Sequence, residues 1–164
     1  MTIRLGVNVD HIATLRNARC EKHPDPYLSS IKCLNYGADS ITIHLREDRR
    51  HIKDKDLKLI SSNKQIPLNL EIASNIKMLN IALKYKPNFV CIVPEKRNEI
   101  TTEGGLNLKK NINKIKFIVD ALNKKKIRTS LFINPSINDV RLSKKINSKC
   151  IELHTGKISN NIKN

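Results

Sequence analysis

Leu5-Gly-Val-Asn-Val-Asp10 decides the fold together with three stretches that alternate in the same way: Ile41-Thr-Ile-His-Leu45, Leu68-Asn-Leu-Glu-Ile72 and Ile151-Glu-Leu-His154. In each stretch one parity of side chains is apolar, and the other carries Asn, Asp, Thr, Glu or His. Successive side chains of a strand point to opposite faces, so each strand has one polar face. A parallel strand that is buried on both faces is ordinarily almost continuously apolar. Four such strands therefore indicate a shared polar cavity.

Strands and helices alternate along the chain. Six strands are predicted, at Ile3–Val9, Ser40–Leu45, Pro67–Ile72, Phe89–Val93, Thr129–Ile133 and Cys150–His154. Apolar residues at helical spacing predict five helices, at Pro26–Tyr36, Lys53–Asn63, Asn75–Tyr85, Asn111–Lys125 and Ser136–Ile146. Alternation of this length is typical of βαβ units and a parallel sheet.

The architecture that brings polar groups of several parallel strands into one cavity is the TIM (β/α)8 barrel, whose site lies at the carboxyl ends of the strands. An open doubly wound sheet would need a separate reason for every polar strand. We therefore predict an α/β fold of the TIM-barrel type, here incomplete, with about six strands present. The expected organisation is one partial barrel over residues 1–156, followed by a polar tail over residues 157–164.

A net charge of +16 raises the alternative of a nucleic-acid-binding protein. Most of the excess is lysine, and Asn and Ile are abundant with it, which is typical of a genome rich in A and T. Lysine runs such as 124–126 lie on predicted helices or at their ends, where charge runs are usually solvated. Aromatic residues for base stacking are not interleaved with them. We therefore expect small-molecule partners rather than nucleic acid.

Other features of the composition set the expected location and cofactors. No apolar run reaches the roughly 18 residues of a membrane span, and Met1-Thr-Ile-Arg-Leu-Gly6 lacks the layout of a signal peptide. A cytoplasmic protein away from membranes is the expectation. Cysteines at 20, 33, 91 and 150 have no zinc-site spacing, so neither a metal nor a cofactor is predicted. Cys91 and Cys150 lie in apolar runs, where a thiol behaves as a small hydrophobe.

His44 and Glu71 occupy equivalent inward positions on neighbouring predicted strands. A histidine and a carboxylate whose pKa is raised by partial burial are suitable partners for proton transfer. The alternative is a buried histidine paired with a structural glutamate. Glu152 and His154 repeat the pattern on the last predicted strand.

The loop after the second predicted strand contains Arg46, Arg49, Arg50 and His51. Arginine suits phosphate because its planar guanidinium donates two parallel hydrogen bonds. The loop is thus a candidate anion site at the mouth of the barrel. A solvated loop tied by ion pairs to Glu47 and Asp48 is an equal alternative on residue types alone.

Longer stretches resemble a known family. Gly6-Val-Asn-Val-Asp-His-Ile-Ala-Thr-Leu-Arg-Asn-Ala-Arg19 and Ile43-His-Leu-Arg-Glu-Asp-Arg-Arg-His-Ile52 are similar to signature segments of the pyridoxine 5'-phosphate synthases. Shorter matches follow in the family's order at Asn69-Leu-Glu71, Val93-Pro-Glu-Lys-Arg97, Thr101-Thr-Glu-Gly-Gly105 and Ile151-Glu-Leu-His-Thr-Gly156. The resemblance covers residues 3–156.

The resemblance implies a TIM barrel that condenses 1-deoxy-D-xylulose 5-phosphate with 3-amino-2-oxopropyl phosphate into pyridoxine 5'-phosphate, with release of phosphate and water and without a metal. It also implies a homo-oligomer, an octamer built from dimers. By match, His44 is the expected general base, Glu71 a second acid/base group, and Glu152 a group that stabilises the transition state. Asn8 and Arg19 are expected to hold the aminoketone phosphate. The residues expected to bind the deoxyxylulose phosphate are Asp10, His11, Arg46, His51 and Thr101.

The sequence departs from the family in three ways. Cys20 and Ser40 replace common glycines, and Asn134 replaces an aspartate after the fifth strand. The third departure is length, because the family continues through a catalytic histidine and the phosphate-binding loops after strands seven and eight. A fragment, an inactive remnant and a working shortened protein are therefore open alternatives, and residues 1–164 alone are expected to lack activity.

Overall fold

The structure is a computed structural model, and it describes residues 3–95 and 104–156. It contains one six-stranded sheet in which every neighbouring pair is parallel, in the order β1-β2-β3-β4-β5-β6. The strands are β1 (Gly6–Asn8), β2 (Ser40–His44), β3 (Leu68–Ala73), β4 (Phe89–Val93), β5 (Arg128–Ile133) and β6 (Cys150–Leu153). The helices are α1 (Asp10–Ala18), α2 (Pro26–Asn35), α3 (Asp54–Ser62), α4 (Ile76–Tyr85), α5 (Leu108–Lys124) and α6 (Ile137–Lys145).

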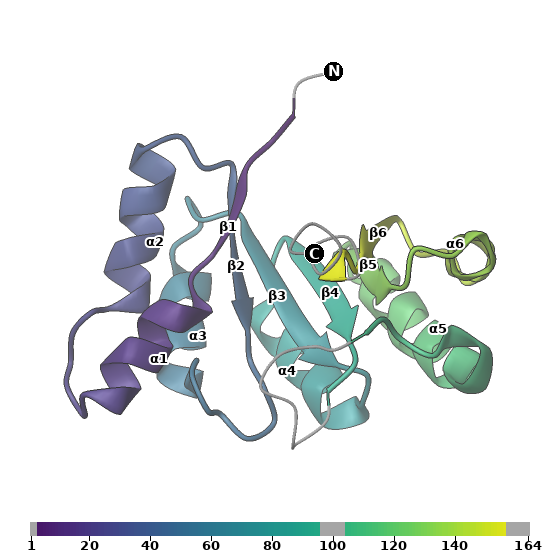
Figure 1. The fold of residues 1–164 in the computed structure, drawn as a ribbon, viewed down its shortest axis with the longest axis horizontal. Helices are drawn as coiled ribbons and strands as arrows, with labels where there is room; N and C mark the ends of the chain where they lie inside the picture. The colour runs from purple at the N-terminus through teal and green to yellow at the C-terminus, as the bar shows by residue number, and fades with distance from the viewer. Residues whose placement is uncertain (1–2, 96–103, 157–164) are drawn as a thin grey trace, which may run out of the picture.

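The strand order distinguishes a TIM-type barrel from an open doubly wound sheet. A doubly wound sheet changes direction at a switch point, so its strands are not adjacent in sequence order throughout. Here each strand pairs with the next strand along the chain. The sheet is curled, and the helices lie around its outside (Figure 1). The prediction of an incomplete TIM-type barrel is confirmed.

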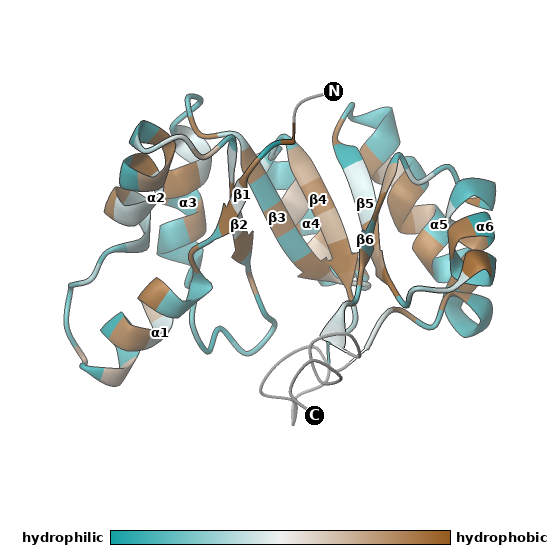
Figure 2. Cartoon of the chain, turned by 45° about the horizontal axis from the view of Figure 1, so that its top comes forward, coloured by the Kyte–Doolittle hydropathy of each residue, from teal (hydrophilic) through white to brown (hydrophobic). Residues whose placement is uncertain are grey.

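The apolar parity of the strands forms the core with the helices. Fully buried side chains come from alternate positions of the strands, such as Ile41 and Ile43 on β2 and Leu68, Leu70 and Ile72 on β3. These alternating bands are visible along β3 in Figure 2. The opposite, polar parity therefore faces the hollow side of the sheet.

The first predicted strand is shorter than expected, because Ile3 and Leu5 are exposed and only Gly6–Asn8 pair with β2. Helix α1 was not predicted. Its buried residues are Asp10, Ala13 and Arg16, two of which are charged, so apolar periodicity could not reveal it. Arg16 donates two hydrogen bonds to the buried carboxylate of Asp56, at 2.7 and 2.9 Å, which fixes α1 against α3.

Gly105 lies against the end of β5. A Cβ at this position would overlap the backbone of Ile133 and Asn134, and the Gly105 N–H donates to Asn134 Oδ1 at 3.0 Å. Gly105 is the second of two adjacent glycines, and the lack of a side chain lets the loop backbone approach another strand closely. For Gly105 the close approach is to β5.

Gly105→Ala is therefore expected to lower the free energy of unfolding by about 1–3 kcal/mol, because the backbone must move to admit a methyl group. Gly104→Ala is the matched control, since a Cβ there would lie 3.8 Å from Asn134 Oδ1, an ordinary contact. Urea unfolding of both variants measures the difference. Equal stability of the two variants would show that the backbone around Gly105 can move to admit a methyl group without loss of stability.

Candidate active site

His44 is the last residue of β2, at the carboxyl end of the sheet, and is 5% exposed. Its register partner on β3 is Glu71, so the two side chains stand next to each other on the hollow face. The distance from His44 Nδ1 to Glu71 Oε2 is 3.7 Å. On its other side, His44 Nε2 lies 3.3 Å from Glu95 Oε2. The imidazole is thus flanked by a carboxyl group at each ring nitrogen.

Asp10, which follows β1, contacts the backbone of His44. Its Oδ1 accepts the His44 backbone N–H at 2.8 Å. Asn8 and Asp10 bond each other reciprocally, since Asn8 Nδ2 donates to Asp10 Oδ2 at 3.0 Å and Asp10 N donates to Asn8 Oδ1 at 2.8 Å. The Asp10 carboxylate is therefore held in place by β1 and β2 together.

Glu71 lies in a strongly anionic and poorly hydrated position. Burial raises the pKa of Glu71 to about 8, and the negative charges of Glu152 and Asp10 act in the same direction. Its neighbour in register on β4 is Cys91. Burial, reinforced by Glu152, holds the pKa of the Cys91 thiol well above its ordinary value. At neutral pH Glu71 is mostly a neutral acid, and Cys91 remains a thiol.

The raised pKa of Glu71 predicts that stability depends on pH. The unfolded pKa is 4.5 and the folded pKa is about 8, so the folded state binds the extra proton between these values. The stabilisation is complete below pH 4.5 and is lost as the pH rises through 8. Between pH 6 and pH 8 the free energy of unfolding is expected to fall by about 2 kcal/mol. Urea unfolding should show this fall in the wild type and a much smaller one in Glu71→Gln. Equal slopes in the two proteins would rule out a titrating Glu71.

The arginine-rich loop divides into two parts. Arg49 pairs with Asp54 at 2.9 Å and Arg50 with Asp48 at 2.6 Å, so both take part in ion pairs of the solvated-loop kind. Arg46 also lies near a loop carboxylate, with its Nε 3.6 Å from Asp48 Oδ1, but it is only 3% exposed and is close enough to His51 and Glu95 to influence their pKa values. Arg46 is the arginine of this loop that belongs to the site.

His51 lies beside His44, with 6.0 Å between the ring centroids. Burial lowers the pKa of His51; Asp10 opposes this effect, while His44, Arg46 and His11 add to it. The Ile52 backbone N–H donates to His51 Nδ1 at 2.9 Å, so Nδ1 is the acceptor nitrogen and Nε2 carries the proton. A neutral His51 presents that N–H as a hydrogen-bond donor.

Comparisons with known proteins show the family to which the chain belongs. The family model described as "Pyridoxal phosphate biosynthesis protein PdxJ" matches residues 5–164. The chain belongs to this family. It is 60% identical over 160 residues to the pyridoxine 5'-phosphate synthase of Pelagibacter ubique, covering 98% of this chain and 67% of the relative. The synthase of Zymomonas mobilis is 52% identical, with coverage of 98% and 62%. The chain thus spans about two thirds of the length of the relatives that it matches.

A solved structure also matches in fold. Phosphoribosylanthranilate isomerase from Thermotoga maritima superposes with a TM-score of 0.52 and 17% identity, over 93% of this chain and 64% of the isomerase. At that identity the likeness concerns the fold alone. Among the described residues of this PdxJ-family chain, no helix is long and apolar enough to cross a membrane.

The structure brings together most of the residues predicted for the site. Asp10 contacts Asn8, the His44 backbone and His51, and His44 lies next to Glu71. Arg46 is close enough to influence the pKa of His51, and Glu152 is close enough to influence the pKa of Glu71. His11 is exposed at the start of α1, and Arg19 is exposed at its C-cap. Thr101 lies outside the described residues.

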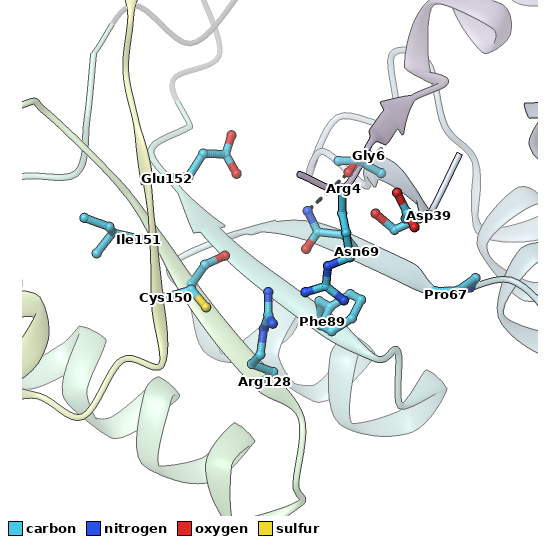
Figure 3. A pocket seen from close by; sticks show the side chains of 13 residues that line it. Arg4, Gly6, Asp39, Pro67, Asn69, Phe89, Arg128, Cys150, Ile151 and Glu152 are labelled. Atoms are coloured by element: carbon cyan, nitrogen blue, oxygen red, sulfur yellow. Dashed lines mark hydrogen bonds between the residues drawn. The ribbon is translucent and has the colours of Figure 1, made fainter. Parts of the chain in front are cut away.

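A cavity of about 460 Å³ lies on the hollow face below these groups. Its lining runs from Arg4, Asp39 and Arg128 near the amino ends of the strands to Asn69 and Glu152 (Figure 3). Asn69 Nδ2 donates to Thr42 Oγ1 at 3.2 Å, while the buried Asn69 Oδ1 has no hydrogen-bond partner among the described residues. The polar hollow face predicted from strand parity is therefore present below the His44 site as well as at it.

Sequence reasoning missed Glu95. The segment Val93-Pro-Glu-Lys-Arg97 was recognised as similar to the PdxJ family, but no role was assigned to its glutamate. The sequence position of Glu95 could have revealed it. Glu95 follows the last residue of β4 by two residues, so it lies at the same carboxyl edge of the sheet as His44 and Glu71. A charged side chain at that edge of a barrel strand is a candidate for the site.

Proposed function

We propose that the His44 site performs the proton transfers of pyridoxine 5'-phosphate synthesis from 1-deoxy-D-xylulose 5-phosphate and 3-amino-2-oxopropyl phosphate, with release of phosphate and water. The observation that carries the proposal is the imidazole of His44 flanked by Glu71 and Glu95 at the carboxyl end of the sheet. Ring closure with loss of water needs a base to remove protons and an acid to protonate leaving oxygens. A histidine next to a neutral carboxylic acid supplies both.

His44 is the proposed general base and Glu71 the proposed acid. The raised pKa of Glu71 keeps a transferable proton on it at neutral pH. Glu152 faces the same hollow and adds negative charge, which suits stabilisation of a cationic transition state. The role proposed for Glu71 uses the protonation state that its surroundings favour.

The two substrates each carry a phosphate, and two of the proposed binding residues, Arg46 and His51, lie in the loop that follows the proposed base. Arg46 and His51 offer buried donors, with Asp10, His11 and Thr101 completing the proposed deoxyxylulose phosphate site. Asn8 and Arg19 are proposed for the aminoketone phosphate. In the structure the Asn8 amide is already bonded to Asp10, so its part in binding would begin from a fixed orientation.

The proposal extends to assembly and location. We propose a homo-oligomer, the assembly that the resemblance to the pyridoxine 5'-phosphate synthases implies. A biosynthetic role with phosphorylated substrates is compatible with a cytoplasmic protein.

A hybrid protein tests the function. In it, the matched segment of this chain replaces the corresponding 160 residues of the Pelagibacter ubique synthase. The purified hybrid, given both substrates, is expected to form pyridoxine 5'-phosphate, detected by its absorbance and mass. A folded hybrid that binds both substrates yet forms no product would contradict the proposed function and would favour an inactive remnant.

A further inference from the structure

Glu95 holds two loops together with one buried carboxylate. Its side chain is 5% exposed. Oε2 lies 3.3 Å from His44 Nε2, and Oε1 accepts the backbone N–H of Glu47 at 2.8 Å. Each oxygen thus has its own partner, and both partners belong to β2 or to the loop that follows it. A carboxylate fixed at two points can orient the ring that it contacts.

The two carboxyl groups that flank His44 differ in charge. Burial acts to raise the pKa of Glu95, but the hydrogen bonds from His44 and the Glu47 N–H, together with the charges of His44 and Arg46, outweigh it, and the net pKa is lowered. Glu71 has its pKa raised to about 8. At neutral pH Glu95 is therefore an acceptor only, whereas Glu71 still has a proton to donate.

This asymmetry fixes the protons on the ring. An ionised carboxylate at 3.3 Å from Nε2 requires that nitrogen to be the N–H donor. A neutral imidazole with a proton on Nε2 has its lone pair on Nδ1, the nitrogen that faces Glu71. The base and the acid then adjoin each other on the same side of the ring.

We propose that Glu95 is a positioning residue that holds His44 in the Nε2–H tautomer, so that Nδ1 is the nitrogen that accepts the substrate's proton. The inference deepens the proposed function and rests on it for its catalytic half. Nδ1 takes one proton from the substrate and becomes an imidazolium, whose charge Glu95 balances. Glu71 gives its proton to a leaving oxygen. The imidazolium then passes the Nδ1 proton to Glu71, 3.7 Å away, which restores both groups.

The tautomer can be measured without turnover. In the 164-residue chain with 15N-labelled histidine, the ring nitrogens of His44 are expected at pH 7.5 to show Nε2 protonated and Nδ1 unprotonated in the neutral form. Glu95→Ala should move the ring to a mixture of tautomers. Glu47→Ala is the matched control, because it removes an exposed carboxylate from the same loop and keeps the backbone N–H that Glu95 accepts. A wild-type ring protonated on Nδ1, or the same tautomer in Glu95→Ala, would overturn the inference.

Turnover of the hybrid protein supplies the second readout. Glu95→Gln keeps the size of the side chain and removes its charge, so it is expected to fold and to lower kcat roughly 100-fold with little change in KM. Glu95→Asp should recover part of the loss, because it restores the charge at a longer distance. Normal kcat in Glu95→Gln, or an effect confined to KM, would contradict the positioning role. If the unsubstituted hybrid makes no product, the proposed function fails while the tautomer measurement still decides whether Glu95 orients His44.

Discussion

His44→Asn in the hybrid protein is expected to lower kcat for pyridoxine 5'-phosphate formation by roughly 10²–10⁴, the usual contribution of a general base. His44 sits at the end of β2 on the polar face and contributes little to the apolar core. Its backbone N–H, which bonds Asp10, survives the substitution. The variant should therefore fold normally and still bind both phosphorylated substrates.

His23→Asn is the matched control, since it makes the same substitution at an exposed histidine outside the site. Circular dichroism and urea unfolding of both variants establish that they are folded. Near-normal kcat in His44→Asn would remove the general-base assignment. A rise in KM with unchanged kcat would instead assign His44 to substrate binding.

The second large effect concerns the polypeptide of residues 1–164 expressed alone, which is expected to form no pyridoxine 5'-phosphate. In the described residues β1 and β6 each pair with one neighbour, so the sheet is curled but not closed. A barrel removes its edges only when the last strand pairs with the first. Residues 1–164 also do not include the catalytic histidine and the phosphate-binding loops that the family resemblance implies after strands seven and eight.

The measurement is growth without vitamin B6 of a bacterium that lacks its own synthase. Cells expressing residues 1–164 should fail to grow, and cells expressing the hybrid at a similar level should grow. Growth with residues 1–164 alone would show that the chain, or an assembly of it, builds a complete site.

The sequence predicts the sheet better than it predicts the loops. Strand parity in Ile41–Leu45 and Leu68–Ile72 locates His44 and Glu71 on one face, because a two-residue period survives in any parallel sheet. It also predicts the polar hollow that Asn69 and Glu152 line. Parity places His44 and Glu71 on the same face, but it does not show that they are neighbours. The pairing of β2 with β3 in this register places them side by side.

Features that depend on polar burial were missed for a physical reason. Helix α1 buries Asp10 and Arg16, so its inner face does not read as apolar. Glu95 comes from a loop, and loop geometry has no period. The loop arginines could not be ranked by residue type, because Arg46 and Arg49 both lie near a carboxylate and differ in how deeply they are buried.

The measurement that tests the account most directly is the titration of the Glu71 carboxyl carbon by 13C NMR in the 164-residue chain, with Glu71→Gln to assign the signal. A buried acid/base pair at the strand ends predicts a midpoint near pH 8, because burial and the charges of Glu152 and Asp10 oppose ionisation. A midpoint near the ordinary value of 4.5 would contradict it. Glu71 would then be a hydrated carboxylate with no proton to give beside His44.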